Sequence, residues 1–61
     1  MRKLNDQVLK EHGFRMLMTT DEAKFYHYNN IWIEQVYGDK YKIRGSEVVM
    51  ETEKDLLKQI L

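Results

Sequence analysis

The stretch FYHYNNIWIEQVY, residues 25–37, decides the fold, because it reads as two β-strands joined by a tight turn. Asn29 and Asn30 stand between runs rich in aromatic and β-branched residues, and asparagine tolerates the positive φ of a type I′ turn. A two-residue turn at this point sets the pairs Tyr28–Ile31, His27–Trp32, Tyr26–Ile33 and Phe25–Glu34. The sequence therefore predicts a β-hairpin at the centre of the chain.

The length of the next loop decides which side chains share a face of the sheet. Gly38-Asp39 favours a two-residue type II′ turn into a strand over residues 40–44. One face then carries Phe25, His27, Trp32, Glu34, Val36, Tyr41 and Ile43, and the other carries Lys24, Tyr26, Tyr28, Ile31, Ile33, Gln35, Tyr37, Lys40, Lys42 and Arg44. A three-residue loop over residues 38–40 instead moves Tyr41 and Ile43 to the face of Ile31, Ile33 and Tyr37, turns Phe25, His27 and Trp32 outward and pairs Glu34 with Arg44. Both registers remain open at this point.

The flanking segments complete an α+β fold. Helical spacing of apolar residues predicts a short helix over residues 3–12 that ends at Gly13, and alternation predicts a strand over residues 14–20, with a turn at Asp21 and Glu22. Residues 47–50 form either a short strand or the first turn of a longer helix that starts at Ser46, and Val48 and Val49 favour the strand. Thr52 is a good N-cap for a helix over residues 52–61. We expect one domain over residues 1–61: an N-terminal helix, a three-stranded antiparallel meander with a possible short fourth strand, and a C-terminal helix packed on the sheet.

Size and composition exclude several classes of protein. A chain of 61 residues has room for one small core, and its lack of cysteine excludes disulfides and thiolate metal sites. Its formal charge is zero, and no apolar run is long enough to cross a membrane or to serve as a signal peptide core. We therefore expect a cytoplasmic protein with no membrane contact and no cofactor, for which a second copy is the most available source of extra buried area.

Large apolar residues fall on both faces of the predicted sheet, and two short helices cannot cover both. The excess predicts a surface for a partner, most simply a second copy of the chain. The residues that we expect there are Tyr26, Tyr28, Ile31, Trp32, Ile33 and Tyr37. The four methionines are expected to fill the core.

Few residues in the sequence indicate a catalytic, metal-binding or nucleic-acid-binding site. His12 and His27 are not spaced with other ligands as a zinc site requires, and the chain has no phosphate-binding loop. The alternating cations Lys40, Lys42 and Arg44, beside Tyr26 and Tyr28, could contact a nucleic-acid backbone, although such a row also solubilises a strand and protects it from aggregation.

The segments LKEHGFRMLM and KFYHYNN and the closing DLLKQIL give the chain a layout that resembles HicA-type mRNA-interferase toxins. The resemblance rests on Gly13-Phe14 and on His27, which stands where the family has its catalytic histidine; the Gly-Ser step that precedes the family's histidine is replaced here by Phe25-Tyr26. It implies RNA cleavage with His27 as general acid or base and the basic strand holding phosphates. The layout also resembles that of many small phage or mobile-element proteins.

The sequence thus supports two hypotheses. The first is a non-enzymatic protein–protein interaction module that acts as a homodimer through an aromatic sheet face. The second is a HicA-like module that binds or cleaves RNA.

Overall fold

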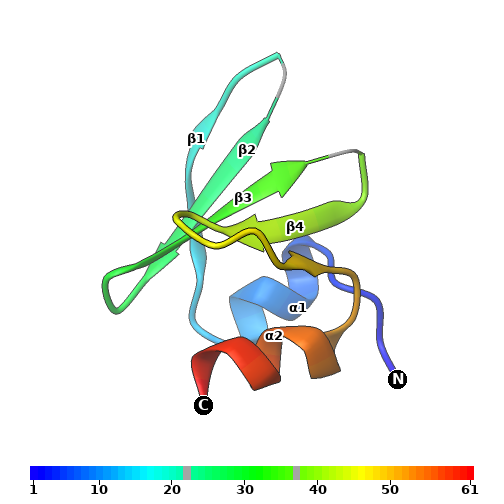
Figure 1. Cartoon of the computed structure of the whole chain (residues 1–61). Coiled ribbons are helices and arrows are strands. Elements are labelled where there is room, and N and C mark those ends of the chain that lie inside the picture. The colour runs from blue at the N-terminus through cyan, green and yellow to red at the C-terminus, as the bar shows by residue number, and fades with distance from the viewer. Residues whose placement is uncertain (22, 37) are drawn as a thin grey trace.

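The protein is one antiparallel sheet with two helices on the same side of it (Figure 1). The structure is a computed structural model that describes residues 1–21, 23–36 and 38–61. Within these residues five strands follow one another in the order β1-β2-β3-β4-β5. The elements are α1 (Asp6–Glu11), β1 (Arg15–Thr19), β2 (Lys24–Tyr28), β3 (Ile31–Val36), β4 (Lys40–Ile43), β5 (Val49–Met50) and α2 (Glu53–Ile60). The α+β class is confirmed, but the sheet has more strands than the three or four predicted, because β1, β4 and β5 all join the central hairpin.

The central hairpin has the predicted register. Asn29 and Asn30 have φ values of 50° and 67°, as a type I′ turn requires. Strands β2 and β3 pair in the four predicted pairs, from Tyr28–Ile31 at the turn to Phe25–Glu34. The local chemistry of two asparagines was therefore sufficient to fix this part of the sheet.

The second hairpin differs from both predicted registers. Val36 pairs with Lys40, and Glu34 lies opposite Lys42 rather than opposite Ile43 or Arg44. Three residues separate Val36 from Lys40, as in the three-residue alternative, but that alternative placed its loop at residues 38–40. That alternative nevertheless had the correct division of faces, because Ile33 pairs with Ile43, and Tyr41 is buried with Ile33 in the core. The free energy gained by burying these side chains outweighs the preference of Gly38-Asp39 for a two-residue turn. The prediction of a two-residue loop is therefore wrong.

The core lies between the helices and the side of the sheet that faces them, which we call the inner face. Among the described residues, the buried apolar side chains are Leu4, Val8, Leu9, Phe14, Tyr26, Ile33, Tyr41, Met50 and Leu56. The rings of Tyr26 and Tyr41 meet edge to face at 6.1 Å between centroids. Burial raises the pKa of both hydroxyls, so both rings remain neutral packing groups.

The N-terminal helix is shorter than predicted. Asn5 caps it, with the side-chain oxygen accepting from the backbone N–H of Val8 at 2.9 Å, and Gly13 follows its end with φ of 96°. Lys3 does not join the helix because it forms a β-bridge with Thr52. The helix therefore begins only where Asn5 can cap it.

Strand β1 differs most from expectation. The structure has a β-bulge between Met16 and Met18, and all five residues of β1 are exposed. Met50 is buried, but Met1, Met16 and Met18 are exposed, so the prediction that methionines fill the core is right only for Met50.

Candidate interaction face

The side of the sheet turned away from the helices, here called the outer face, is not covered by any described segment (Figure 1). Alternation along each strand assigns its residues, because the neighbours of buried Tyr26, Ile33, Tyr41 and Met50 point to the opposite side. One row across the sheet is Met18, Phe25, Glu34, Lys42 and Val49, the next is Arg15, His27, Trp32 and Arg44, and Val36 and Lys40 extend the face toward the other end of β3 and β4.

The centre of the outer face is aromatic and partly exposed. The rings of His27 and Trp32 lie 4.6 Å apart between centroids, on neighbouring strands. A shallow hollow of about 530 Å³ is lined by Met18, Thr20, Phe25, Trp32, Ile33, Glu34 and Arg44. An apolar hollow with a few charged groups at its edge is a typical site for a side chain or ring of a partner.

The outer face is basic although the chain as a whole has no net charge. Arg15, Lys40, Lys42 and Arg44 lie on it, and Glu34 is the one described carboxylate among its residues, although Lys40 also lies 3.8 Å from the carboxylate of Glu51. Charge is therefore separated between this face and the rest of the molecule, and the face favours an acidic partner.

The structure divides the residues predicted to bind a partner. Tyr26 and Ile33 are buried in the core, so their side chains are not available to a partner, and Ile31 packs against the same core. Tyr28 is 49% exposed but lies on the inner face, where its ring meets that of Phe14 edge to face at 5.6 Å. Trp32 lies on the outer face, and Tyr37 is outside the described residues. Of the six, Trp32 is thus the one described residue that belongs to the outer face.

The basic row, which consists of Lys40 and Lys42 on β4 and of Arg44 just after this strand, is brought together on one face, as alternation predicts. It does not lie beside Tyr26 and Tyr28, because the register of the second hairpin turns both tyrosines to the inner face. Its aromatic neighbours are Phe25, His27 and Trp32, which the three-residue alternative had turned outward.

No protein-family model, curated protein or solved structure matches this chain. The resemblance to HicA-type toxins therefore stays a prediction, and the function has to be argued from the site. The described residues contain no group of three or more His, Cys, Asp or Glu side chains that could hold a metal ion. None of the described helices is long and apolar enough to cross a membrane.

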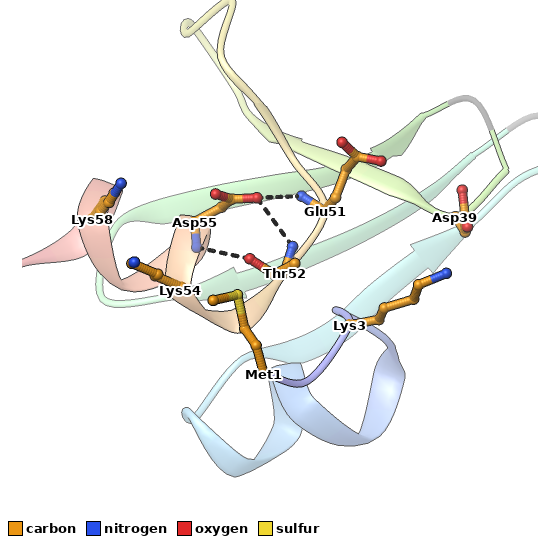
Figure 2. Close-up of a pocket in the computed structure, with 8 residues that line it drawn as sticks. All are labelled: Met1, Lys3, Asp39, Glu51, Thr52, Lys54, Asp55 and Lys58. Atoms are coloured by element: carbon orange, nitrogen blue, oxygen red, sulfur yellow. Dashed lines mark hydrogen bonds between the residues drawn. The ribbon is translucent and has the colours of Figure 1, made fainter.

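A second, polar hollow of about 430 Å³ lies at the start of α2 (Figure 2). Lys3, Lys54 and Lys58 and the carboxylates of Asp39, Glu51 and Asp55 line it. Asp55 is occupied as a helix cap, because one of its oxygens accepts from the backbone N–H groups of Glu51 and Thr52 at 3.0 and 3.1 Å while Thr52 caps Asp55 in return. These hydrogen bonds lower the pKa of Asp55. The hollow therefore has a structural explanation, as a capping box that begins α2.

A network of four charged or titratable side chains joins the N-terminus to both helices. Arg2 contacts Glu11 at 2.7 Å and makes two bonds to Glu53 at 2.7 and 3.1 Å, and Nε2 of His12 lies 2.6 Å from the same carboxylate. Hydrogen bonds from Arg2 and His12 lower the pKa of Glu53 to about 2, and Arg2 also lowers the pKa of Glu11. Sequence reasoning missed this network because Arg2 and Glu53 are 51 positions apart.

This network predicts loss of stability in acid. A carboxyl group whose pKa is lower in the folded state stabilises the fold above its unfolded pKa of 4.5, and this contribution is lost as the pH falls toward 2. We expect the free energy of unfolding, measured by urea titration at a series of pH values, to fall over this window, and Glu53→Gln to flatten that fall. The matched control is Glu47→Gln, at an exposed glutamate that has no ion pair with any described residue. An unchanged pH profile in Glu53→Gln would refute the role of the network.

Proposed function

We propose that the protein is a non-enzymatic interaction module that works as a homodimer and binds a second protein through its outer face. The observation that carries the proposal is that both helices pack on one side of the sheet, while the other side keeps Phe25 and Trp32 partly exposed around a hollow. Aromatic side chains of this kind dominate the binding energy of protein interfaces, because they bury a large area at a small cost in side-chain entropy.

Charge supports a partner different from the chain itself at this face. Arg15, Lys42 and Arg44 of two copies would repel one another if two outer faces met. A partner surface with an apolar centre and an acidic rim would fill the hollow and neutralise the cations. The outer face is therefore proposed for a second protein, and the two copies must join elsewhere.

A second candidate function is binding of single-stranded RNA at the same face. It is favoured by one observation, that the cations of β4 share the face with His27 and Trp32, because cations that track phosphates beside rings that stack on bases are typical of such proteins. Under this candidate, His27 would be the general acid or base of an RNA-cleaving activity, as the HicA resemblance implies.

Charge reversal at Lys42 and Arg44 tests the proposal against this alternative. We expect wild-type protein to capture a partner protein from an extract of its host cells treated with nuclease, and the double variant Lys42→Glu, Arg44→Glu to lose it. The matched control is Lys54→Glu, Lys58→Glu, which makes the same change in charge on exposed positions of α2. Circular dichroism establishes that both double variants fold.

Two results would overturn the proposed function. One is equal capture by the wild type and by the Lys42→Glu, Arg44→Glu variant, which would move the interface off the outer face. The other is no captured protein together with binding of a labelled single-stranded RNA. In that case three cations on phosphates predict a slope of log affinity against log salt of about −2, and the second candidate replaces the first.

A further inference from the structure

We infer that two copies of this chain pair through strand β1, antiparallel and centred on Leu17, so that one sheet extends across the dimer. The inference rests on the proposed function in one respect, that the protein works as a homodimer. It adds the place and the register at which the copies join.

Strand β1 is an edge strand of the sheet. No described segment pairs with its free edge, which is the edge opposite β2. It pairs with β2 alone, at one end of the strand order, and in Figure 1 it rises away from both helices. An edge strand leaves alternate backbone N–H and C=O groups without a partner in the sheet, and such a row is a template for another strand.

The other edge of the sheet is closed by the chain itself. The N-terminal segment runs beside the residues that follow β5: Leu4 donates to the carbonyl of Glu51 at 3.0 Å, and Glu53 donates to the carbonyl of Arg2 at 2.8 Å. The two edges are therefore not equivalent. Within the described residues, only the β1 edge offers a full strand for pairing.

Most of the exposed side chains of β1 are apolar, so their burial in an interface would be favourable. Met16, Leu17 and Met18 are 43%, 59% and 52% exposed and follow one another along the strand. Proteins commonly protect an open edge with lysine or proline, but Arg15 is the only charge in β1 and the chain has no proline. Three consecutive exposed apolar residues on an open edge therefore indicate an interface.

The sequence of β1 is also complementary to itself. In an antiparallel pair with a two-fold axis at Leu17, the two Leu17 side chains meet, and positions 15 and 16 of one copy lie opposite positions 19 and 18 of the other. Because the bulge pairs Met16 with Tyr26 on the inner face and Met18 with Phe25 on the outer face, the two Met16 side chains are diagonal neighbours on one face of the seam and the two Met18 side chains are diagonal neighbours on the other. The two Arg15 side chains lie at opposite ends of the interface and do not repel one another. A pair of identical surfaces with no like charges opposed is what a symmetric dimer requires.

The β-bulge between Met16 and Met18 limits the strength of this pairing. A bulge bends a strand and interrupts its ladder, so the contact depends on the six apolar side chains more than on a long row of backbone hydrogen bonds. Three apolar residues from each copy make a small interface, and we expect a dissociation constant of about 10–100 µM for the dimer.

Pairing at β1 would also serve the outer face. Arg15 and Met18 lie on β1 and on the outer face, so the outer faces of the two copies become neighbours across the seam. A partner with two matching sites would then bind both copies at once, and the linked sites would raise the overall affinity without new contacts.

Sedimentation equilibrium tests the dimer. We expect wild-type protein to shift from monomer to dimer between about 10 µM and 1 mM, and Leu17→Lys, which opposes two ammonium groups at the axis, to weaken the dimer at least about ten-fold. Val48→Lys is the matched control, because Val48 is similarly exposed (48%) and lies outside β1. Leu17→Ser provides a second variant in case the lysine variant does not fold. Wild-type protein that stays monomeric, or dimers that Leu17→Lys and Leu17→Ser leave intact, would overturn the inference.

A single introduced cysteine tests the register. Because the chain has no cysteine, Leu17→Cys carries one thiol, and paired Leu17 positions bring two thiols within disulfide reach. We expect mild oxidation to cross-link Leu17→Cys much faster than Val48→Cys at equal concentration. Equal rates would contradict the pairing centred on Leu17.

The two proposals fail in different ways. Leu17→Lys is expected to remain able to bind a partner as a monomer, whereas Lys42→Glu, Arg44→Glu is expected to dimerise and to bind none. Wild-type dimers that the Leu17 variants leave intact therefore remove only the inference about β1, whereas wild-type protein that stays monomeric also removes the homodimer of the proposed function. A wild-type dimer that binds no partner removes only the outer-face partner.

Discussion

Replacing Leu56 by alanine is expected to leave a large fraction of the protein unfolded. Leu56 is the residue of α2 that is completely buried, and it belongs to the core cluster that joins this helix to the sheet. Truncating a buried leucine costs about 2–5 kcal/mol, because it removes apolar contacts and leaves a cavity. A chain of 61 residues has a total stability of about 3–9 kcal/mol. The loss is therefore comparable with everything that keeps the protein folded.

The matched control is Leu61→Ala, the same substitution at a residue that is 96% exposed. We expect urea denaturation followed by circular dichroism to give a much lower midpoint for Leu56→Ala and an unchanged midpoint for Leu61→Ala. Both measurements belong at one protein concentration, because dimerisation would make the midpoint depend on it. Equal midpoints for the two variants would mean that α2 does not pack on the sheet as the structure has it.

Local sequence chemistry was sufficient for the elements whose geometry is set by a few neighbouring residues. Two asparagines fixed the turn and the register of β2 and β3, and Thr52 fixed the start of α2. Each of these signals works over about four residues, so no knowledge of the rest of the chain is needed. The α+β class follows from them.

The second hairpin could not be predicted in the same way, because two preferences conflict there. Gly38-Asp39 favours a two-residue turn, but that register would send Tyr41 and Ile43 to the side away from Ile33. In the structure Tyr41 joins Tyr26 and Ile33 under the helices. Only the position of the helices shows that the larger gain in burial lies with the longer loop.

The register of the second hairpin decides which face of the sheet is exposed. This is why the residues predicted to form the candidate site divide between the core and the surface. Tyr26 and Ile33 become core, while Phe25 and His27 join Trp32 outside. Exposure of Met16 and Met18 was not predictable either, because it depends on β1 being an edge that rises beyond the helices. Alternation predicts which residues share a face, but not which face is covered.

The effect of replacing Gly13 follows from the sequence and the structure together. Its place after α1 was predictable, and its φ of 96° is strained for any residue with a Cβ, at a cost of about 1–2 kcal/mol. The structure adds a contact that the sequence does not reveal: a Cβ at Gly13 would lie 3.0 Å from the ring of Tyr28. We therefore expect Gly13→Ala to lower the free energy of unfolding by about 2–3 kcal/mol, the contact adding roughly 1 kcal/mol of overpacking.

Gly45→Ala separates the two causes. Gly45 has a similar φ of 90°, but a Cβ there meets nothing within 4 Å, so the variant should lose only the conformational part. Removing the ring by Tyr28→Ala should then reduce the cost of Gly13→Ala to that of Gly45→Ala, as a double-mutant cycle measured by urea denaturation would reveal. Equal losses in Gly13→Ala and Gly45→Ala, with no coupling to Tyr28, would mean that the ring yields freely. In that case the glycine after α1 is needed for its backbone alone, and the packing of Tyr28 over the end of α1 contributes nothing to the stability of the fold.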